Sequence, residues 1–169
     1  WEKEIEFEKI TKGTIAVVEA DFSPNSIALL LALINHGCIF VPITKSVGSK
    51  RNEFIEIAQG EVLFNIDAND NVSISDLPYK SKHEIYQKLR ERGHPGLVLF
   101  SSGSTGKSKA CVHDITGIIE KFKVRRHTLR AITFLLYDHI GGFNTLLYTL
   151  SNAGLIVTVS DRSPDGVLK

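Results

Sequence analysis

The sequence alternates between short apolar segments rich in β-branched residues and longer segments with helical patterning. Residues 14–20, TIAVVEA, are typical of a buried strand, and residues 23–37 begin with Ser-Pro and end with Gly, as helices do. Further strands are expected at residues 38–43, 61–67, 97–100, 110–113, 131–137 and 155–160, and further helices at residues 49–60, 81–93, 115–122 and 141–154. Apolar strands separated by helices predict an α/β fold, with a mostly parallel sheet and helices on both faces.

Two of these helices carry capping signals at their first turn. The Ser-x-x-Glu spacing of Ser81 and Glu84 predicts a capping box, and Asp114 is placed to cap the helix at residues 115–122. Residues 67–82 are polar and turn-rich, so we expect a surface excursion there with a short additional strand.

Composition limits the class of protein. The 169 residues, 43% hydrophobic and 23% charged, suit a single domain (1–169). A net charge of +1 gives no strong field for nucleic acid, and the longest apolar run, IALLLALI, is too short to span a membrane. With no signal peptide, we expect a cytoplasmic protein in which Cys38 and Cys111 are reduced thiols. The chain begins at Trp1 and contains no Met, so we expect a fragment of a longer polypeptide.

The segment LVLFSSGSTGKSKACVH, residues 97–113, concentrates small and hydroxyl residues directly after a strand. Glycines allow the backbone to approach a ligand closely, and hydroxyl, amide and lysine donors together suit a polyphosphate. From composition alone, a solvated Ser/Gly turn is the alternative. The candidate phosphate-binding residues are Ser101, Ser102, Gly103, Ser104, Thr105, Gly106, Lys107 and Lys109.

Two phosphate-binding patterns compete for this loop. Gly106-Lys107-Ser108, with a later apolar strand ending at Asp138, resembles a Walker A loop and Walker B acid. The Walker pattern requires Gly five residues before Gly106, however, and Ser101 stands there. The β-like ACVH segment that follows predicts instead that the loop joins two strands, whereas a Walker A loop runs into a helix.

Residues 98–109, VLFSSGSTGKSK, resemble position by position the AMP-binding signature of the adenylate-forming superfamily. This superfamily includes acyl-CoA synthetases, aryl-CoA ligases, peptide-synthetase adenylation domains and luciferases. Two further stretches, residues 29–43 and 137–159, agree with it in the same order, so that the resemblance runs from about residue 23 to 160. The sequence departs from the signature at Ser108, where Pro is usual, and at Ala110, where Gly is usual.

The resemblance implies part of an N-terminal AMP-binding domain that activates a carboxylic acid. The acid attacks the α-phosphorus of ATP to give an acyl-adenylate, and the thiol of coenzyme A or a carrier then takes the acyl group. By resemblance, Ser104, Thr105, Gly106 and Lys109 hold the β- and γ-phosphates, Ser101, Ser102 and Gly103 shape the loop, and Mg²⁺ bridges phosphate oxygens. The main expectation is an acyl-CoA ligase of fatty acid or aryl acid metabolism. The alternatives are a peptide-synthetase amino-acid adenylation domain and a non-enzymatic nucleotide-binding or interaction module.

Residues after the loop are expected to line the acyl pocket. His139 stands where CoA ligases carry the His of Phe-His-x-x-Gly, followed by Gly141 and Gly142. Asp138 resembles the Asp that pairs with a substrate amine in peptide synthetases, but HIGG favours a CoA ligase. The superfamily's catalytic Lys and its Tyr-Gly-x-Thr-Glu stretch do not occur in the sequence, so we expect no catalytic residue here and no adenylation by this chain alone. No metal ligand set is predicted, and an unpaired sheet edge is expected to form a homodimer.

Overall fold

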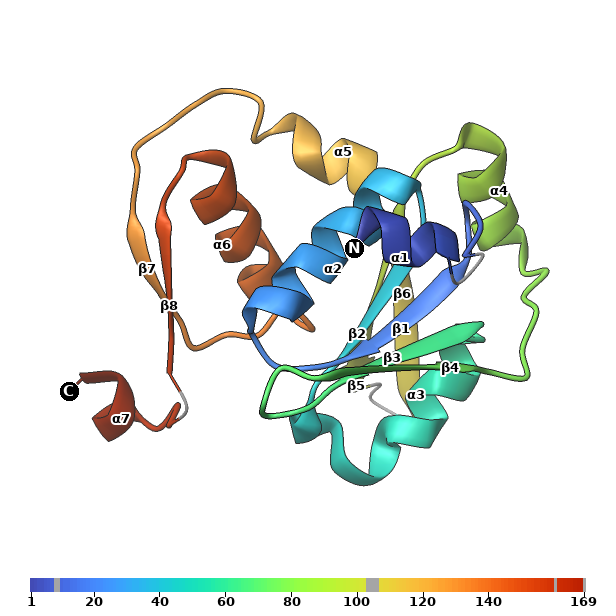
Figure 1. Ribbon diagram of the computed structural model, residues 1–169, viewed down its shortest axis with the longest axis horizontal. Coiled ribbons are helices and arrows are strands. Elements are labelled where there is room, and N and C mark those ends of the chain that lie inside the picture. The colour runs from blue at the N-terminus through green and yellow to red at the C-terminus, as the bar shows by residue number, and fades with distance from the viewer. Residues whose placement is uncertain (8–9, 103–106, 160, 169) are drawn as a thin grey trace. The chain divides into compact units, whose positions relative to one another are not determined.

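The computed structural model describes residues 1–7, 10–102, 107–159 and 161–168 (Figure 1). It divides into two compact units, Trp1–Thr116 and Gly117–Lys169. The first unit contains a six-stranded sheet and the second a two-stranded sheet. Over the part of the chain that the structure describes, no helix has the length and apolar character needed to cross a membrane.

The six-stranded sheet has a parallel centre and antiparallel edges, in the order β4-β3-β1-β2-β5-β6. Its parallel strands are β1 (Ile15–Glu19), β2 (Ile39–Ile43), β3 (Val62–Ile66) and β5 (Gly96–Ser102). The edge strands are β4 (Val72–Asp76) and β6 (Ser108–Asp114). The predicted α/β fold with a mostly parallel sheet is confirmed, and β4 is the additional strand expected in the polar excursion.

Helices cover both faces of this sheet, as predicted. They are α1 (Glu2–Phe7), α2 (Pro24–His36), the 3₁₀-helix η1 (Lys45–Lys50), α3 (Arg51–Ala58) and α4 (Glu84–Arg92). The short helix α5 (Ile115–Glu120) follows β6 and includes the boundary between the two units. Ile55 of α3 and Tyr86 of α4 share one buried cluster with strand residues that include Val41. Because side chains alternate along a strand, Phe40 points to the opposite face, where α2 contacts β2. Figure 1 shows α1 beside α2 in front of the strands.

The caps of α2 form as the sequence predicts. Ser23 Oγ accepts the Ser26 N–H at 3.1 Å, and Ser26 Oγ accepts the Ser23 N–H at 2.9 Å. Gly37 ends the helix in the left-handed conformation, with φ of 80°, which glycine adopts without steric cost. The predicted cap of α5 is also confirmed, since Asp114 Oδ1 accepts the Thr116 N–H at 3.0 Å.

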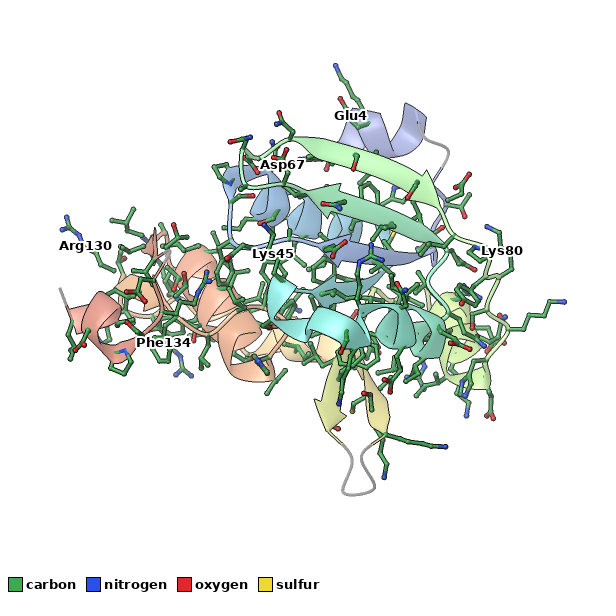
Figure 2. The ribbon with its side chains drawn as sticks, turned by 90° about the horizontal axis from the view of Figure 1, so that it is seen from below. Glu4, Lys45, Asp67, Lys80, Arg130 and Phe134 are labelled. Carbon is green, nitrogen blue, oxygen red and sulfur yellow. The ribbon has the colours of Figure 1, made fainter. Side chains whose placement is uncertain are left out.

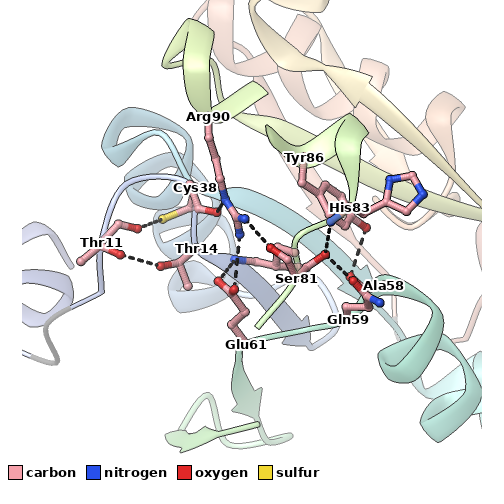
Figure 3. A network of polar contacts seen from close by, with 12 residues as sticks. Thr11, Thr14, Cys38, Ala58, Gln59, Glu61, Ser81, His83, Tyr86 and Arg90 are labelled. Atoms are coloured by element: carbon pink, nitrogen blue, oxygen red, sulfur yellow. Dashed lines mark hydrogen bonds and ion pairs between the residues drawn. The ribbon is translucent and has the colours of Figure 1, made fainter. Parts of the chain in front are cut away.

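The predicted capping box of Ser81 and Glu84 is wrong. The N-cap of α4 is His83, whose Nδ1 accepts the Ile85 N–H at 3.2 Å. Ser81 is instead buried, and its hydroxyl donates to Gln59 Oε1 in the network of Figure 3. The serine therefore connects the segment before α4 to the end of α3, and its oxygen accepts the N–H of the cap residue His83 at 3.3 Å rather than an N–H of the first helical turn.

Arg90 and Glu61 organise the rest of that network (Figure 3). The Arg90 guanidinium donates to the backbone oxygens of Ser81 at 2.6 Å and Gly13 at 3.0 Å, and lies 3.3 Å from Glu61 Oε1. Glu61 Oε2 accepts the Ile15 N–H at 3.1 Å. Burial of these charges is offset because each is both paired and hydrogen-bonded, so we interpret the network as structural.

The second unit is one parallel crossover. Strands β7 (Arg130–Thr133) and β8 (Leu155–Thr158) pair in parallel and are connected through α6 (Ile140–Ser151), and α7 (Pro164–Leu168) follows. The predicted strand at residues 131–137 is too long, since it ends at Thr133. Residues 134–139 turn instead toward α6, and Tyr137 in that turn is fully buried.

The two cysteines are free thiols in contrasting surroundings. Burial, with the charge of Glu61 as a second cause, raises the pKa of Cys38 to about 12, whereas Cys111 is exposed on β6. Because the thiolate is the reactive form, at about pH 8 we expect a chromogenic disulfide reagent to label Cys111 quickly and Cys38 only after denaturation. The Cys111→Ser variant should then lose the fast phase. Two fast equivalents from the native protein would contradict this assignment.

Candidate functional site

The candidate phosphate loop joins two antiparallel strands, as the sequence predicts. β5 pairs with β6 in a register that places Ser101 opposite Lys109 and Ser102 opposite Ser108. β6 begins at Ser108, so no helix starts at the lysines as it would in a Walker A loop. Residues 103–106 lie outside the described residues, and the predicted roles of Gly103, Ser104, Thr105 and Gly106 stay predictions.

The loop leaves the carboxyl end of β5, which shares one edge of the sheet with the carboxyl ends of β1, β2 and β3. Open α/β sheets bind ligands outside this edge. Figure 2 shows the ends of β5 and β6 projecting from the first unit. Ser101, Lys107 and Lys109 are all exposed there, so the described part of the loop presents two cations to solvent.

Helix α3 contacts both strands that flank the loop. Glu53 Oε1 accepts the backbone N–H of Ser108 at 3.2 Å. The Phe54 ring stacks on Phe100 of β5, with ring centroids 3.9 Å apart and planes 16° from parallel. Hydrogen bonding from Ser108 lowers the pKa of Glu53, so this carboxylate is ionised at neutral pH. Neither contact could be predicted from local patterns, because the partners are far apart along the chain.

A groove of about 400 Å³ lies beside the loop, over β6. Its walls come from the ends of α3 and α4 and from β6: Ile57, Gln59, His83, Ile85, Tyr86, Ser108, Lys109, Ala110 and Val112. Ala110, one of the two departures from the signature, therefore lines this groove. His113 lies half-buried on β6 opposite Leu97.

The predicted acyl-pocket residues belong to the second unit, at the start of α6. His139 is the N-cap residue, but its side chain makes no capping hydrogen bond and is 65% exposed. Its Nε2 lies 3.8 Å from Oδ1 of Asp138, whose side chain is only 12% exposed. His139 is thus open to a ligand, whereas the Asp138 carboxylate is held largely within the protein.

The two glycines after His139 differ sharply. A Cβ at Gly142 would meet the carbonyl oxygens of Leu135 and Leu136 well inside the 3.0 Å that real Cβ contacts respect. A Cβ at Gly141 would meet only the Leu135 side chain, at 3.4 Å. Gly142 is therefore required for packing of α6 on the preceding turn.

Comparisons with known proteins agree with this fold. No protein-family model matches the chain. A hybrid PKS-NRPS synthetase, gkaA of Penicillium citrinum, is 26% identical over 170 residues, which cover 90% of this chain and 4% of the synthetase. The N-terminal subdomain of NpsA from Klebsiella oxytoca, solved in complex with 3-hydroxyanthranilyl-AMSN, shares the fold with a TM-score of 0.68 and 18% identity, over 93% of this chain and 43% of that one.

The chain has the fold of the NpsA N-terminal subdomain. A second solved structure, the artificially fused adenylation-PCP di-domain NpsA-ThdA of Klebsiella oxytoca, matches with a TM-score of 0.69 and 16% identity, over 93% of this chain and 34% of the fusion. The chain thus spans less than half of these two structures and a small part of the synthetase. The β5–β6 hairpin contains the described part of residues 98–109, the segment that resembles the AMP-binding signature.

Proposed function

We propose that the protein activates a carboxylic acid with ATP, and the observation that carries the proposal is the hairpin-borne loop with its exposed lysines. A carboxylate oxygen of the substrate forms a bond to the α-phosphorus, and the bond from that phosphorus to the bridging oxygen breaks. Pyrophosphate leaves with the electron pair. The nucleophile belongs to the substrate, so the protein's task is to orient the phosphates and stabilise charge.

The loop residues divide this task. Lys109 and Lys107 place positive charge beside the β- and γ-phosphates. Hydroxyl and backbone donors of Ser104, Thr105 and Gly106 complete the predicted cradle. ATP brings Mg²⁺ with its phosphate oxygens, and the described residues contain no group of three or more His, Cys, Asp or Glu side chains that could hold a metal ion. No step of the proposal therefore depends on a metal held by this part of the chain.

The acid is an amino acid or an aryl acid, and the acceptor is a carrier thiol. The relatives support this alternative better than the acyl-CoA ligase: one is a PKS-NRPS synthetase, one binds a 3-hydroxyanthranilyl compound, and one is fused to a PCP. Coenzyme A as the acceptor and self-association of the chain remain predictions from the sequence.

ATP–pyrophosphate exchange by the full-length protein tests this proposal. A panel of amino acids, hydroxylated benzoic acids and fatty acids is offered one at a time with labelled pyrophosphate. We expect exchange with one or a few amino or aryl acids. Exchange with fatty acids only would restore the acyl-CoA ligase, and no exchange with any acid would favour a nucleotide-binding module without catalysis.

The exposed His139 provides a second test. We expect His139→Ala to raise the apparent KM for the acid by about fivefold, the effect of one lost polar contact, and to leave the KM for ATP unchanged. His127→Ala is the matched control, because His127 is also an exposed histidine of the second unit. Equal changes in both KM values would remove His139 from the acid site.

A further inference from the structure

Glu53 occupies an unexpected place for an acidic side chain, at the foot of a loop that is proposed to bind polyphosphate. Its Oε1 accepts the N–H of Ser108 at 3.2 Å, and Ser108 is the first residue of the edge strand β6. Ser108 itself is buried, whereas Lys107 and Lys109 on either side of it are exposed. The contact with Glu53 therefore fixes the backbone between the two cations and leaves their side chains open to a ligand.

This contact lies at the last strand pair before the loop. Ser102 and Ser108 form the last pair of the β5–β6 ladder before residues 103–106. Two residues earlier on β5, Phe100 stacks on Phe54, the neighbour of Glu53 on α3. One helix thus holds both strands at the point where they separate. Lys107 and Lys109 flank the restrained Ser108, and donors that are already held in place lose less conformational freedom on binding, so such a restraint favours binding.

The residue at position 108 explains why a hydrogen bond is needed. The superfamily signature usually has Pro here, and a proline ring fixes φ but has no N–H to donate. Serine lacks the ring but has the donor. The first residue of an edge strand also tolerates proline, because its N–H is not required by the sheet. In this chain Glu53 accepts a hydrogen bond from the N–H of Ser108, a group that proline does not have.

We propose that Glu53 is a positioning residue that restrains the phosphate loop through the Ser108 N–H, in place of a proline ring. The inference rests on the proposed function. It requires the acceptor oxygen of Glu53 rather than its negative charge, which would oppose a polyphosphate. Glu53→Gln should therefore keep the restraint, and Glu53→Ala should lose it.

The test is a set of variants in the full-length protein, assayed by ATP–pyrophosphate exchange. We expect Glu53→Ala to raise the KM for ATP about threefold to tenfold, with a much smaller change in kcat, as for the loss of one hydrogen bond of ordinary strength. Glu53→Gln should stay within about twofold of wild type. Glu56→Ala, which removes an exposed carboxylate of the same helix, is the matched control.

The decisive comparison uses proline itself. In a Ser108→Pro background no N–H remains for Glu53, so adding Glu53→Ala should change the KM for ATP no further. An equal rise in both backgrounds, or a Glu53→Ala effect no larger than that of Glu56→Ala, would overturn the proposal.

Amide hydrogen exchange at Ser108 separates this inference from the proposed function. We expect the Ser108 amide to exchange about tenfold faster in Glu53→Ala than in wild type, with Glu53→Gln close to wild type and equal thermal midpoints in all three. If the wild-type protein catalyses no ATP–pyrophosphate exchange with any acid, the proposed function fails. An unchanged hydrogen-exchange rate of the Ser108 amide in Glu53→Ala would overturn the positioning role.

Discussion

Replacing Lys109 by alanine is expected to lower ATP–pyrophosphate exchange by the full-length protein by about tenfold or more. Lys109 is exposed beside the loop and opposite Ser101 in the β5–β6 ladder, so its ammonium can reach a bound phosphate. Loss of one preorganised donor to developing charge costs a few kcal/mol of transition-state stabilisation, and a tenfold loss, about 1.4 kcal/mol, is the smallest effect that we expect. The measurement is kcat/KM for ATP at saturating acid.

Lys82→Ala is the control for this experiment, because Lys82 is an exposed lysine that lies outside the loop. We expect its kcat/KM to equal that of wild type. Thr105→Ala, within the undescribed residues 103–106, is expected to show a loss similar to that of Lys109→Ala. Unchanged exchange in both Lys109→Ala and Thr105→Ala would show that the loop does not hold phosphates.

Local signals predicted much of the fold. The cap residues Ser23 and Gly37 bound α2 in the structure as they do in the sequence, because each acts on backbone groups within a few residues. The apolar run at residues 38–43 became a fully buried parallel strand for a similar reason: its patterning leaves no polar face for solvent. Predictions of this kind depend on neighbours in sequence.

The failures have long-range causes. Ser81 has the spacing of a capping residue, but its hydroxyl donates to Gln59, a residue on a different helix end. The apolar run at residues 131–137 has no turn signal, yet the chain turns after Thr133 because Gly142 allows α6 to pack against the carbonyl groups of that turn. In both cases tertiary contacts override local preference.

The candidate site also has a part that could be predicted from the sequence and a part that could not. The residues of the loop are consecutive, so the signature and its strand–loop–strand context could be predicted. Glu53 could not, since it reaches Ser108 only after α3 and β6 have packed. The class of acid could not be predicted from the sequence either. The HIGG motif suggested a CoA ligase, whereas the relatives favour amino-acid or aryl-acid adenylation. A His and two glycines do not specify an acid when one of those glycines is required for packing.

Gly142→Ala is expected to destabilise the second unit by about 3 kcal/mol, the upper part of the range for overpacked sites. The added methyl group would overlap the backbone oxygens of Leu135 and Leu136, which cannot move aside as the end of a flexible side chain can. Relief requires α6 to shift away from the turn at residues 134–139, and that shift would expose Tyr137 and Phe143, which are fully buried. The free energy of unfolding is measured by chemical denaturation.

Gly141→Ala is the matched control, one residue earlier in the same helix turn. Its methyl group meets only the Leu135 side chain at 3.4 Å, an ordinary van der Waals distance, and alanine is the better helix former by about 1 kcal/mol. We therefore expect Gly141→Ala to be as stable as wild type or more so. Hydrogen exchange should quicken in α6 of Gly142→Ala and stay unchanged in the strands of the first unit. Equal stability of the two variants would contradict the packing role and make Gly142 a candidate for contact with the acid again. If the expected difference is found, any loss of acid binding in Gly142→Ala is explained by a displaced α6, which displaces His139 as well.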